Sequence, residues 1–156
     1  MSHVGDSNRE TLTRLEDFLN NPKTKYLPSE IWSDDYMEMR PWPFQTGTGR
    51  EGIYTQPTSG QLLMIAFVEL LTEIHQAFKD YHVAMPLIIS EGENVAVKMV
   101  ITGTHTGTFK GIPPHSKSVH WEILAVMRIR DGLIYEQESF RDWLELMSQL
   151  QWPRRQ

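Results

Sequence analysis

The stretch that decides the fold is residues 101–142, ITGTHTGTFKGIPPHSKSVHWEILAVMRIRDGLIYEQESFRD. Residues 118–130 and 133–140 within it are rich in Val, Ile and aromatic side chains, which favours β-strands. The Asp131-Gly132 dipeptide between them is typical of a two-residue hairpin turn. The sequence therefore predicts a long antiparallel hairpin that brings several titratable side chains and aromatic rings into one neighbourhood.

The segments around this hairpin complete the expected fold. Residues 59–79 have apolar side chains at helical spacing on most sides, so this helix must be covered by other elements. Helices come first and a meander of strands follows, which predicts an α+β fold with helices packed on one face of a curved antiparallel sheet, in a single domain of residues 1–156. Helices are expected at 7–20, with Ser7 as its N-cap, and at 28–32, 59–79 and 142–151; strands are expected at 34–39, 82–91, 94–106, 118–130 and 133–140.

Composition excludes several classes of function. The 156 residues include no cysteine, which rules out disulfides and thiolate chemistry, and the formal net charge of -5 argues against a nucleic-acid surface. No stretch approaches the roughly 18 apolar residues of a membrane span, and the N-terminus lacks the apolar centre of a signal peptide. We therefore expect a cytoplasmic protein with a small-molecule partner and no contact with nucleic acid or membrane.

The string Gly103-Thr-His-Thr-Gly-Thr-Phe109, followed by Gly111-Ile-Pro-Pro114, closely resembles the "GTHTGxFxGxPP" stretch of SnoaL-like polyketide cyclases, which belong to the nuclear transport factor 2-like superfamily. Similar motifs occur in consistent order at residues 77–80, 91–97 and 146–150. The resemblance spans about residues 59–151 and is therefore more specific than a single motif.

This resemblance implies a cone-shaped half-barrel in which a bent sheet wraps a long helix, commonly as a homodimer joined through sheet faces. It also implies a cyclase of secondary metabolism that uses no cofactor, with an acid/base aspartate near the end of the last strand, which matches Asp142. The fold hosts hydratases, epoxide hydrolases, isomerases and binding proteins as well. Because family positions differ here at Met39-Arg40-Pro41, His115-Ser116 and Gln137-Glu138, we expect a different substrate from that of the best-known cyclases.

An uninterrupted hairpin around Asp131-Gly132 would place Ala125 opposite Glu138 and Trp121 opposite Asp142. One face of the hairpin then carries Trp121, Glu138, Phe140 and Asp142, and we expect this face to be concave. The other face, which carries Leu124, Gln137 and Ser139 among others, would be the convex or dimer face.

The candidate site follows from this register. A carboxyl group beside Trp121 and Phe140 would be desolvated, which raises its pKa towards a value useful for proton transfer at neutral pH. Asp142 is therefore the predicted proton carrier, with His105 as a second acid/base or an oxyanion donor and Glu138 as a third catalytic candidate. No metal is expected. The predicted substrate-binding residues are Trp121, Tyr36, Arg40, Phe140 and Met99.

Each catalytic candidate also has a structural interpretation. Asp142 fits the N-cap of the last helix. His105 sits at a glycine-rich strand end, where its ring could stabilise the turn, and Glu138 could pair with Arg128 or Arg141. His75 lies on the long helix and is interpreted as structural.

The sequence thus predicts a cofactor-independent cyclase or isomerase that acts by acid/base catalysis on an apolar substrate with a carbonyl group. One alternative is a non-catalytic binding or dimerisation module with the same fold. Another is a hydratase or epoxide hydrolase, which needs two carboxylates to hold a water, here Asp142 and Glu138. The proline-rich loop of residues 40–52 either covers the pocket mouth or crosses the surface.

Overall fold

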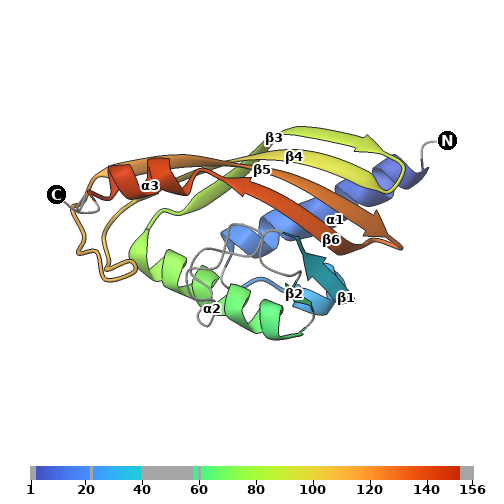
Figure 1. Cartoon of the computed structure of the whole chain (residues 1–156), viewed down its shortest axis with the longest axis horizontal. Coiled ribbons are helices and arrows are strands. Elements are labelled where there is room, and N and C mark those ends of the chain that lie inside the picture. The colour runs from blue at the N-terminus through green and yellow to red at the C-terminus, as the bar shows by residue number, and fades with distance from the viewer. Residues whose placement is uncertain (1–2, 22, 40–57, 60, 152–156) are drawn as a thin grey trace.

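The computed structural model describes residues 3–21, 23–39, 58–59 and 61–151 (Figure 1). In their order of elements, a meander of four long strands follows the second long helix and precedes a short final helix, as predicted. The elements are α1 His3–Asn20, the short 3-10 helix η1 Pro28–Glu30, β1 Trp32–Glu38, β2 Thr58–Ser59, α2 Gln61–Ala77, β3 His82–Glu91, β4 Asn94–Thr104, β5 Ser118–Arg130, β6 Leu133–Arg141 and α3 Trp143–Gln149.

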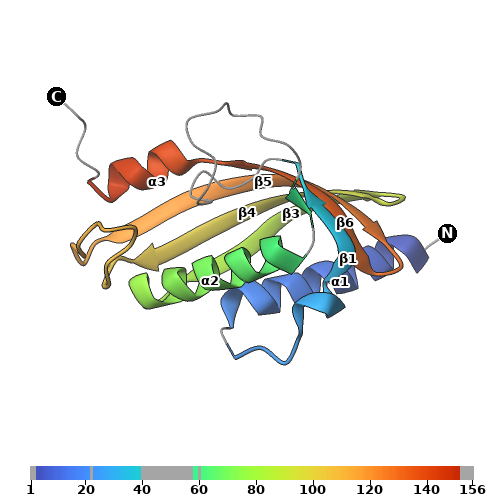
Figure 2. The same ribbon diagram turned by 60° about the horizontal axis from the view of Figure 1, so that its bottom comes forward.

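The strands form one six-stranded sheet in the order β2-β1-β6-β5-β4-β3. Neighbouring strands are antiparallel except β1, which runs parallel to β6. The sheet is curved, and α1 and α2 lie on the same side of it (Figures 1 and 2). The predicted α+β architecture is therefore confirmed. Helix α1 begins four residues before the expected Ser7 cap, and Ser7 instead accepts the Thr11 hydroxyl through its carbonyl.

The turn between β5 and β6 is the predicted two-residue hairpin. Asp131 and Gly132 have φ angles of 51° and 75°, the left-handed conformation that such a turn requires at both central residues. Helix α1 holds the turn in place, because Thr11 Oγ1 and Arg14 Nη2 both donate to the carbonyl of Gly132 at 2.8 Å.

Beyond the turn, the predicted register is wrong by one residue. Ile129 pairs with Ile134, but Arg128 pairs with Glu136, so Tyr135 is an extra residue on β6. Such a β-bulge moves every later side chain of the strand to the opposite face. The concave face of β5 is as predicted, with Trp121, Ala125 and Met127 buried, whereas the concave face of β6 carries Gln137, Ser139 and Arg141.

The Gly-Thr-His-Thr-Gly motif attaches the end of β4 to the end of α2. The backbone N–H groups of Thr106 and Gly107 both donate to the carbonyl of Ala77 at 2.9 Å. A Cβ atom on Gly107 would lie 2.6 Å from the carbonyl oxygen of Gln76, a distance that real Cβ atoms do not reach. Glycine is therefore required at position 107 because two backbone segments touch there.

No helix among the described residues is long and apolar enough to cross a membrane. The predicted loop of residues 40–52 and its candidate Arg40 lie outside the described residues.

Candidate active site

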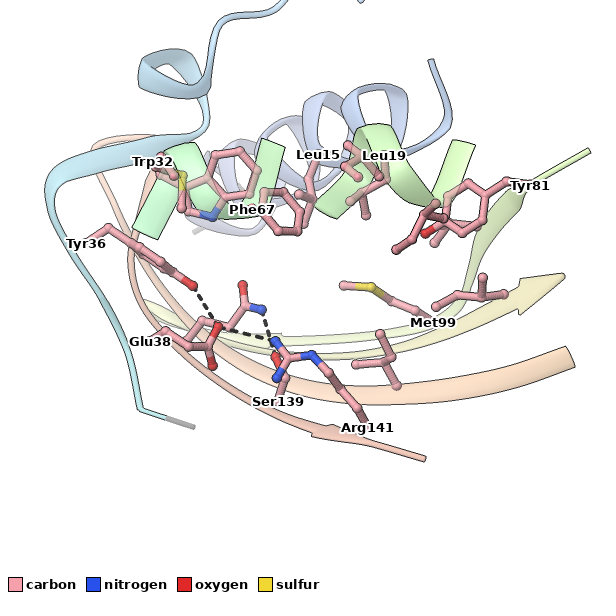
Figure 3. A pocket seen from close by; sticks show the side chains of 17 residues that line it. Leu15, Leu19, Trp32, Tyr36, Glu38, Phe67, Tyr81, Met99, Ser139 and Arg141 are labelled. Atoms are coloured by element: carbon pink, nitrogen blue, oxygen red, sulfur yellow. Dashed lines mark hydrogen bonds and ion pairs between the residues drawn. The ribbon is translucent and has the colours of Figure 1, made fainter. Parts of the chain in front are cut away.

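A cavity lies between the concave face of the sheet and the helices α1 and α2 (Figure 3). The empty space inside it, together with part of its open mouth, is about 690 Å³. Most of its lining is aliphatic or aromatic, as in many small-molecule sites. The lining residues are Leu15, Leu19, Trp32, Tyr36, Glu38, Met64, Phe67, Leu71, Ile74, Tyr81, Val83, Met99, Ile101, Ile123, Gln137, Ser139 and Arg141.

One end of the cavity holds a buried cluster of polar side chains. Glu38 is 1% exposed, and its Oε2 accepts a hydrogen bond from the Tyr36 hydroxyl at 3.0 Å. The same oxygen lies 3.4 Å from Nη2 of Arg141, whose side chain is also almost fully buried. Figure 3 shows the three side chains converging from the strands at this end. A carboxylate, a phenol and a guanidinium therefore share one apolar chamber.

Burial changes the protonation equilibria of this cluster. It raises the pKa of Tyr36 well above its ordinary value, and the nearby negative charge of Glu38 raises it further. Burial lowers the pKa of Arg141, while the attraction of Glu38 opposes that change. Tyr36 consequently keeps its proton, and its hydroxyl donates a hydrogen bond to the Glu38 carboxylate, whose negative charge the guanidinium stabilises.

The sheet topology explains why these groups meet. Tyr36 and Glu38 are two residues apart on β1, so their side chains point to the same face. The parallel pairing of β1 with β6 sets Glu38 beside Gln137, whose Nε2 donates to Ser139 Oγ at 2.7 Å. Because of the bulge at Tyr135, Arg141 also faces inwards. The bulge therefore determines which β6 side chains line the site.

The structure brings two of the predicted site residues into the cavity. Tyr36 and Met99 both line it and are both buried. Met99 reaches it from β4, on the sheet side, and Tyr36 from β1 (Figure 3).

Three predicted residues on β6 and just after it lie elsewhere. The placement of Glu138, Phe140 and Asp142 in the cavity is wrong, because the bulge turns β6 over. Phe140 is 46% exposed on the outer face of the sheet. The carboxylate of Asp142 is exposed and accepts the backbone N–H of Glu145 at 3.0 Å, so the helix-capping alternative is confirmed.

His105 and Trp121 are buried in the core and are not among the residues that line the cavity. The His105 ring stacks on Phe78 with centroids 5.3 Å apart, and the Phe78 ring is also 5.7 Å from that of Trp121. Burial lowers the pKa of His105, and the nearby ring of His115 lowers it further. These contacts favour the structural interpretation of His105.

Glu38 and Arg141 were missed by the sequence reasoning. Strand alternation could have found Glu38, because the predicted site residue Tyr36 lies two positions before it on the same strand. No sequence pattern pointed to Arg141, because the bulge that turns its side chain inwards is not visible in the alternation of apolar and polar residues along β6. Among the described residues, no group of three His, Asp or Glu side chains is placed to hold a metal ion.

Similarity to solved structures supports the fold. A protein from Jannaschia sp. CCS1 assigned to the SnoaL-like polyketide cyclases is 24% identical, with a TM-score of 0.72 over 99% of this chain and 98% of that chain. IdmH from Streptomyces antibioticus, assigned as a polyketide cyclase, is 24% identical with a TM-score of 0.72 over 92% and 97%. AclR from Streptomyces galilaeus, assigned as a hydroxylase, is 20% identical with a TM-score of 0.70 over 94% and 96%.

Comparison of the sequence with models of protein families agrees with the similarity to solved structures. No curated protein matches this chain. The family model described as SnoaL-like polyketide cyclase matches residues 9–150, which includes both strands of the buried polar cluster, most of α1, all of α2 and the Gly-Thr-His-Thr-Gly motif. The chain therefore belongs to the SnoaL-like polyketide cyclase family.

Proposed function

We propose that this protein is a cofactor-independent acid/base enzyme of the cyclase or isomerase type, with Glu38 as its proton carrier. Its substrate is an apolar molecule of secondary metabolism that carries a carbonyl group. The observation that carries this proposal is the Glu38 carboxylate, buried in an apolar cavity within reach of both Tyr36 and Arg141. Membership of the polyketide cyclase family supports the same class of reaction.

The proposed reaction begins with proton transfer from carbon. Glu38 takes a proton from the carbon next to the substrate carbonyl, and the electron pair of that C–H bond moves to the carbonyl oxygen as an enolate. In this proposal, the Tyr36 hydroxyl and the Arg141 guanidinium stabilise this developing negative charge. Preorganised donors of this kind commonly contribute the largest single share of catalysis.

Two outcomes are possible for the enolate. In a cyclisation, its carbon attacks a second carbonyl group of the same substrate, a C–C bond forms, and the new alkoxide takes the proton back from Glu38. In an isomerisation, the protonated Glu38 returns the proton to another carbon. Both sequences restore the carboxylate and consume no co-reactant.

The contents of the cavity favour an enzyme over the binding-module alternative. A pure binding module would have a uniformly apolar cavity, whereas this one holds convergent polar groups whose protonation equilibria are shifted. The hydratase or epoxide hydrolase alternative needs two carboxylates around one water. Glu38 is the one carboxylate among the described lining residues, and the pair considered from sequence, Asp142 and Glu138, lies outside the cavity.

Proton exchange tests the proposal without knowledge of the natural substrate. 2-Tetralone is a bicyclic ketone with acidic hydrogens beside its carbonyl group, and NMR in D₂O follows their replacement by deuterium. Wild-type protein should accelerate this exchange. The Glu38→Gln variant removes the base and keeps the shape of the side chain, so the accelerated rate should fall about 100-fold or more, the range typical of general acid/base groups.

Asp142→Asn is the matched control, because it also neutralises one carboxylate. Asn caps helices as well as Asp does, so this variant should keep both its fold and the exchange rate. A fall in exchange with Asp142→Asn but not with Glu38→Gln would contradict the proposed site. Absence of accelerated exchange in the wild type would contradict the proposed reaction.

A further inference from the structure

A second polar group lies at the other end of the cavity. Tyr81 lines the cavity from the connection between α2 and β3. Its hydroxyl points into the empty space, at the end opposite Tyr36 and Glu38 (Figure 3). The walls between the two ends are apolar, with Phe67 on the helix side and Met99 on the sheet side. The cavity thus has a polar group at each end and an apolar middle.

The Tyr81 hydroxyl has no hydrogen-bond partner among the described residues, and the side chain is half-buried in the cavity wall. Burial raises the pKa of Tyr81 well above its ordinary value, and no neighbouring charge contributes to that change. The group therefore stays protonated at any working pH. Since tyrosine hydroxyls in buried sites usually find a partner, an unused donor that faces a cavity is suited to a ligand oxygen.

The ring of Tyr81 is held firmly by its surroundings. It packs edge-on against His75, with ring centroids 4.9 Å apart, and lies 6.2 Å from the ring of Trp121. His75 is itself fixed, because its Nε2 donates to the carbonyl of Leu19 at 2.9 Å. The backbone N–H of Tyr81 donates to the carbonyl of Phe78 at 3.1 Å. The hydroxyl is consequently preorganised, which reduces the entropy lost on binding.

We propose that Tyr81 is a positioning residue whose hydroxyl binds an oxygen atom at the end of the substrate far from the carbonyl group on which Glu38 acts. The substrate class that follows is an apolar, elongated molecule with an oxygen function at each end. This inference rests on the proposed function for the identity of the reacting end. Two polar contacts, and not the shape of the cavity alone, therefore orient the substrate.

A matched pair of fluorescent probes tests this two-ended recognition. 2-Naphthol has one hydroxyl, and 2,6-dihydroxynaphthalene has the same ring system with a hydroxyl at both ends. Fluorescence titration of the wild type should give about 5- to 10-fold tighter binding of the diol, the factor expected from one additional neutral hydrogen bond together with the statistics of a symmetric ligand. About twofold of that preference is statistical, because the symmetric diol binds in two equivalent orientations.

In Tyr81→Phe, the preference for the diol should fall to this statistical factor, while the affinity for 2-naphthol stays unchanged. The substitution keeps the ring contacts with His75 and Trp121, so the melting temperature should stay near that of the wild type. Tyr135→Phe is the control: the hydroxyl of Tyr135 donates to Glu93 outside the cavity, and both affinities should be those of the wild type. A merely structural role of Tyr81 would change the two affinities equally.

Three results would overturn the inference: no preference for the diol in the wild type, an undiminished preference in Tyr81→Phe, or no binding of either naphthol. The proposed function is judged separately, because the exchange assay compares Glu38 variants with a probe that has a single oxygen. If one proposal is contradicted, the other is therefore still decided by its own experiment.

Discussion

Two ion pairs of this protein differ mainly in their exposure to water. Arg141 and Glu38 are 3.4 Å apart, with side chains 5% and 2% exposed, whereas Arg128 and Glu136 are 3.8 Å apart at 53% and 35%. Breaking a buried pair by removing one partner costs about 3–5 kcal/mol, because the remaining charge stays desolvated. An exposed pair is worth about 0–1 kcal/mol. Burial, and not distance, should therefore decide how much each pair matters.

We predict that Arg141→Met lowers the free energy of unfolding by about 3 kcal/mol, since it removes the cation beside a buried carboxylate. The same change at Arg128 should cost less than about 1 kcal/mol. Urea denaturation of the two variants measures both values. Equal losses in the two variants would contradict the view that Glu38 is a buried ionised group.

His105 should make stability depend on pH. Its pKa in the folded chain is lowered by burial and by His115, below the value of about 6.5 that is usual for an unfolded chain. As the pH falls through 6.5, the unfolded chain binds a proton that the folded chain does not. Folding stability therefore decreases with falling pH, by up to about 1.4 kcal/mol per pH unit for this one group. No such loss is expected from His105 above pH 6.5.

Denaturation curves between pH 7.5 and 5 check this slope. His105→Gln should give a shallower fall in the free energy of unfolding than the wild type, whatever the absolute stability of the variant. His82→Gln, which changes an exposed histidine, is the control. A slope that is the same in all three proteins would show that His105 is not the group that titrates.

Among the elements, the attachment of α2 to β4 explains the most specific motif of the chain. Position 107 has no room for a side chain, because the carbonyl of Gln76 lies where a Cβ would be. Gly107→Ala should therefore lower the free energy of unfolding by about 1–3 kcal/mol, the usual cost of overpacking. Gly5, in α1, has open space where a Cβ would lie, and Gly5→Ala should stabilise by up to about 1 kcal/mol.

Thermal and urea denaturation distinguish the two glycine variants by the sign of their effect. If both were stabilising, the contact between residue 107 and the end of α2 would not persist in solution. The motif would then have to be explained by a role other than the attachment of the helix.

Sequence reasoning was most successful where apolar alternation was strong. Strands β3 and β5 have the predicted bounds, and β4 ends only two residues earlier than expected. The agreement is close because the concave faces of these strands are apolar, and a register error of one residue would expose their apolar side chains to water. Strand β6 has no such constraint after Ile134: both of its faces carry polar residues, so alternation could not reveal the bulge at Tyr135. The candidate site on β6 was misplaced for the same reason, since polar side chains on the face that lines the cavity weaken the signal that locates a strand face.

At the scale of the whole molecule, the outer face of the sheet carries several exposed hydrophobic side chains. These side chains come from β3, β5 and β6. Leu124 pairs directly with Phe140, and Ala96 of the intervening strand β4 pairs with both Ile89 and Val126. Lys98 and Glu122 form a 3.1 Å pair among them, which supplies both signs of charge for contact with a second copy of the same surface. Contiguous apolar patches of this kind commonly mark interfaces. The residues are Leu87, Ile89, Leu124, Val126 and Phe140.

We expect a homodimer formed through this outer face, in agreement with what the family resemblance implied. Leu124→Glu would place a charge in the middle of the patch, so it should shift the protein towards the monomer. Leu27→Glu changes a more exposed leucine on another part of the surface and should not affect assembly. Size-exclusion chromatography with light scattering measures the mass of each protein. A monomeric wild type, or a Leu124→Glu variant that remains dimeric, would contradict this interface.

Helix α1 is tied to the sheet by contacts that are distant along the chain: Asn20 bonds to Val83, Asn8 to Gly92 and Thr11 to Gly132, at separations of 63, 84 and 121 residues. The antiparallel pairings of β3 to β6 form from near neighbours, so this part of the sheet should assemble first, and this helix, like the parallel strand β1, should dock last. Leu15 and Leu19 of the helix complete the cavity wall. Any guest can therefore bind only after the final step of folding, and it should prolong the lifetime of the native state without speeding its formation.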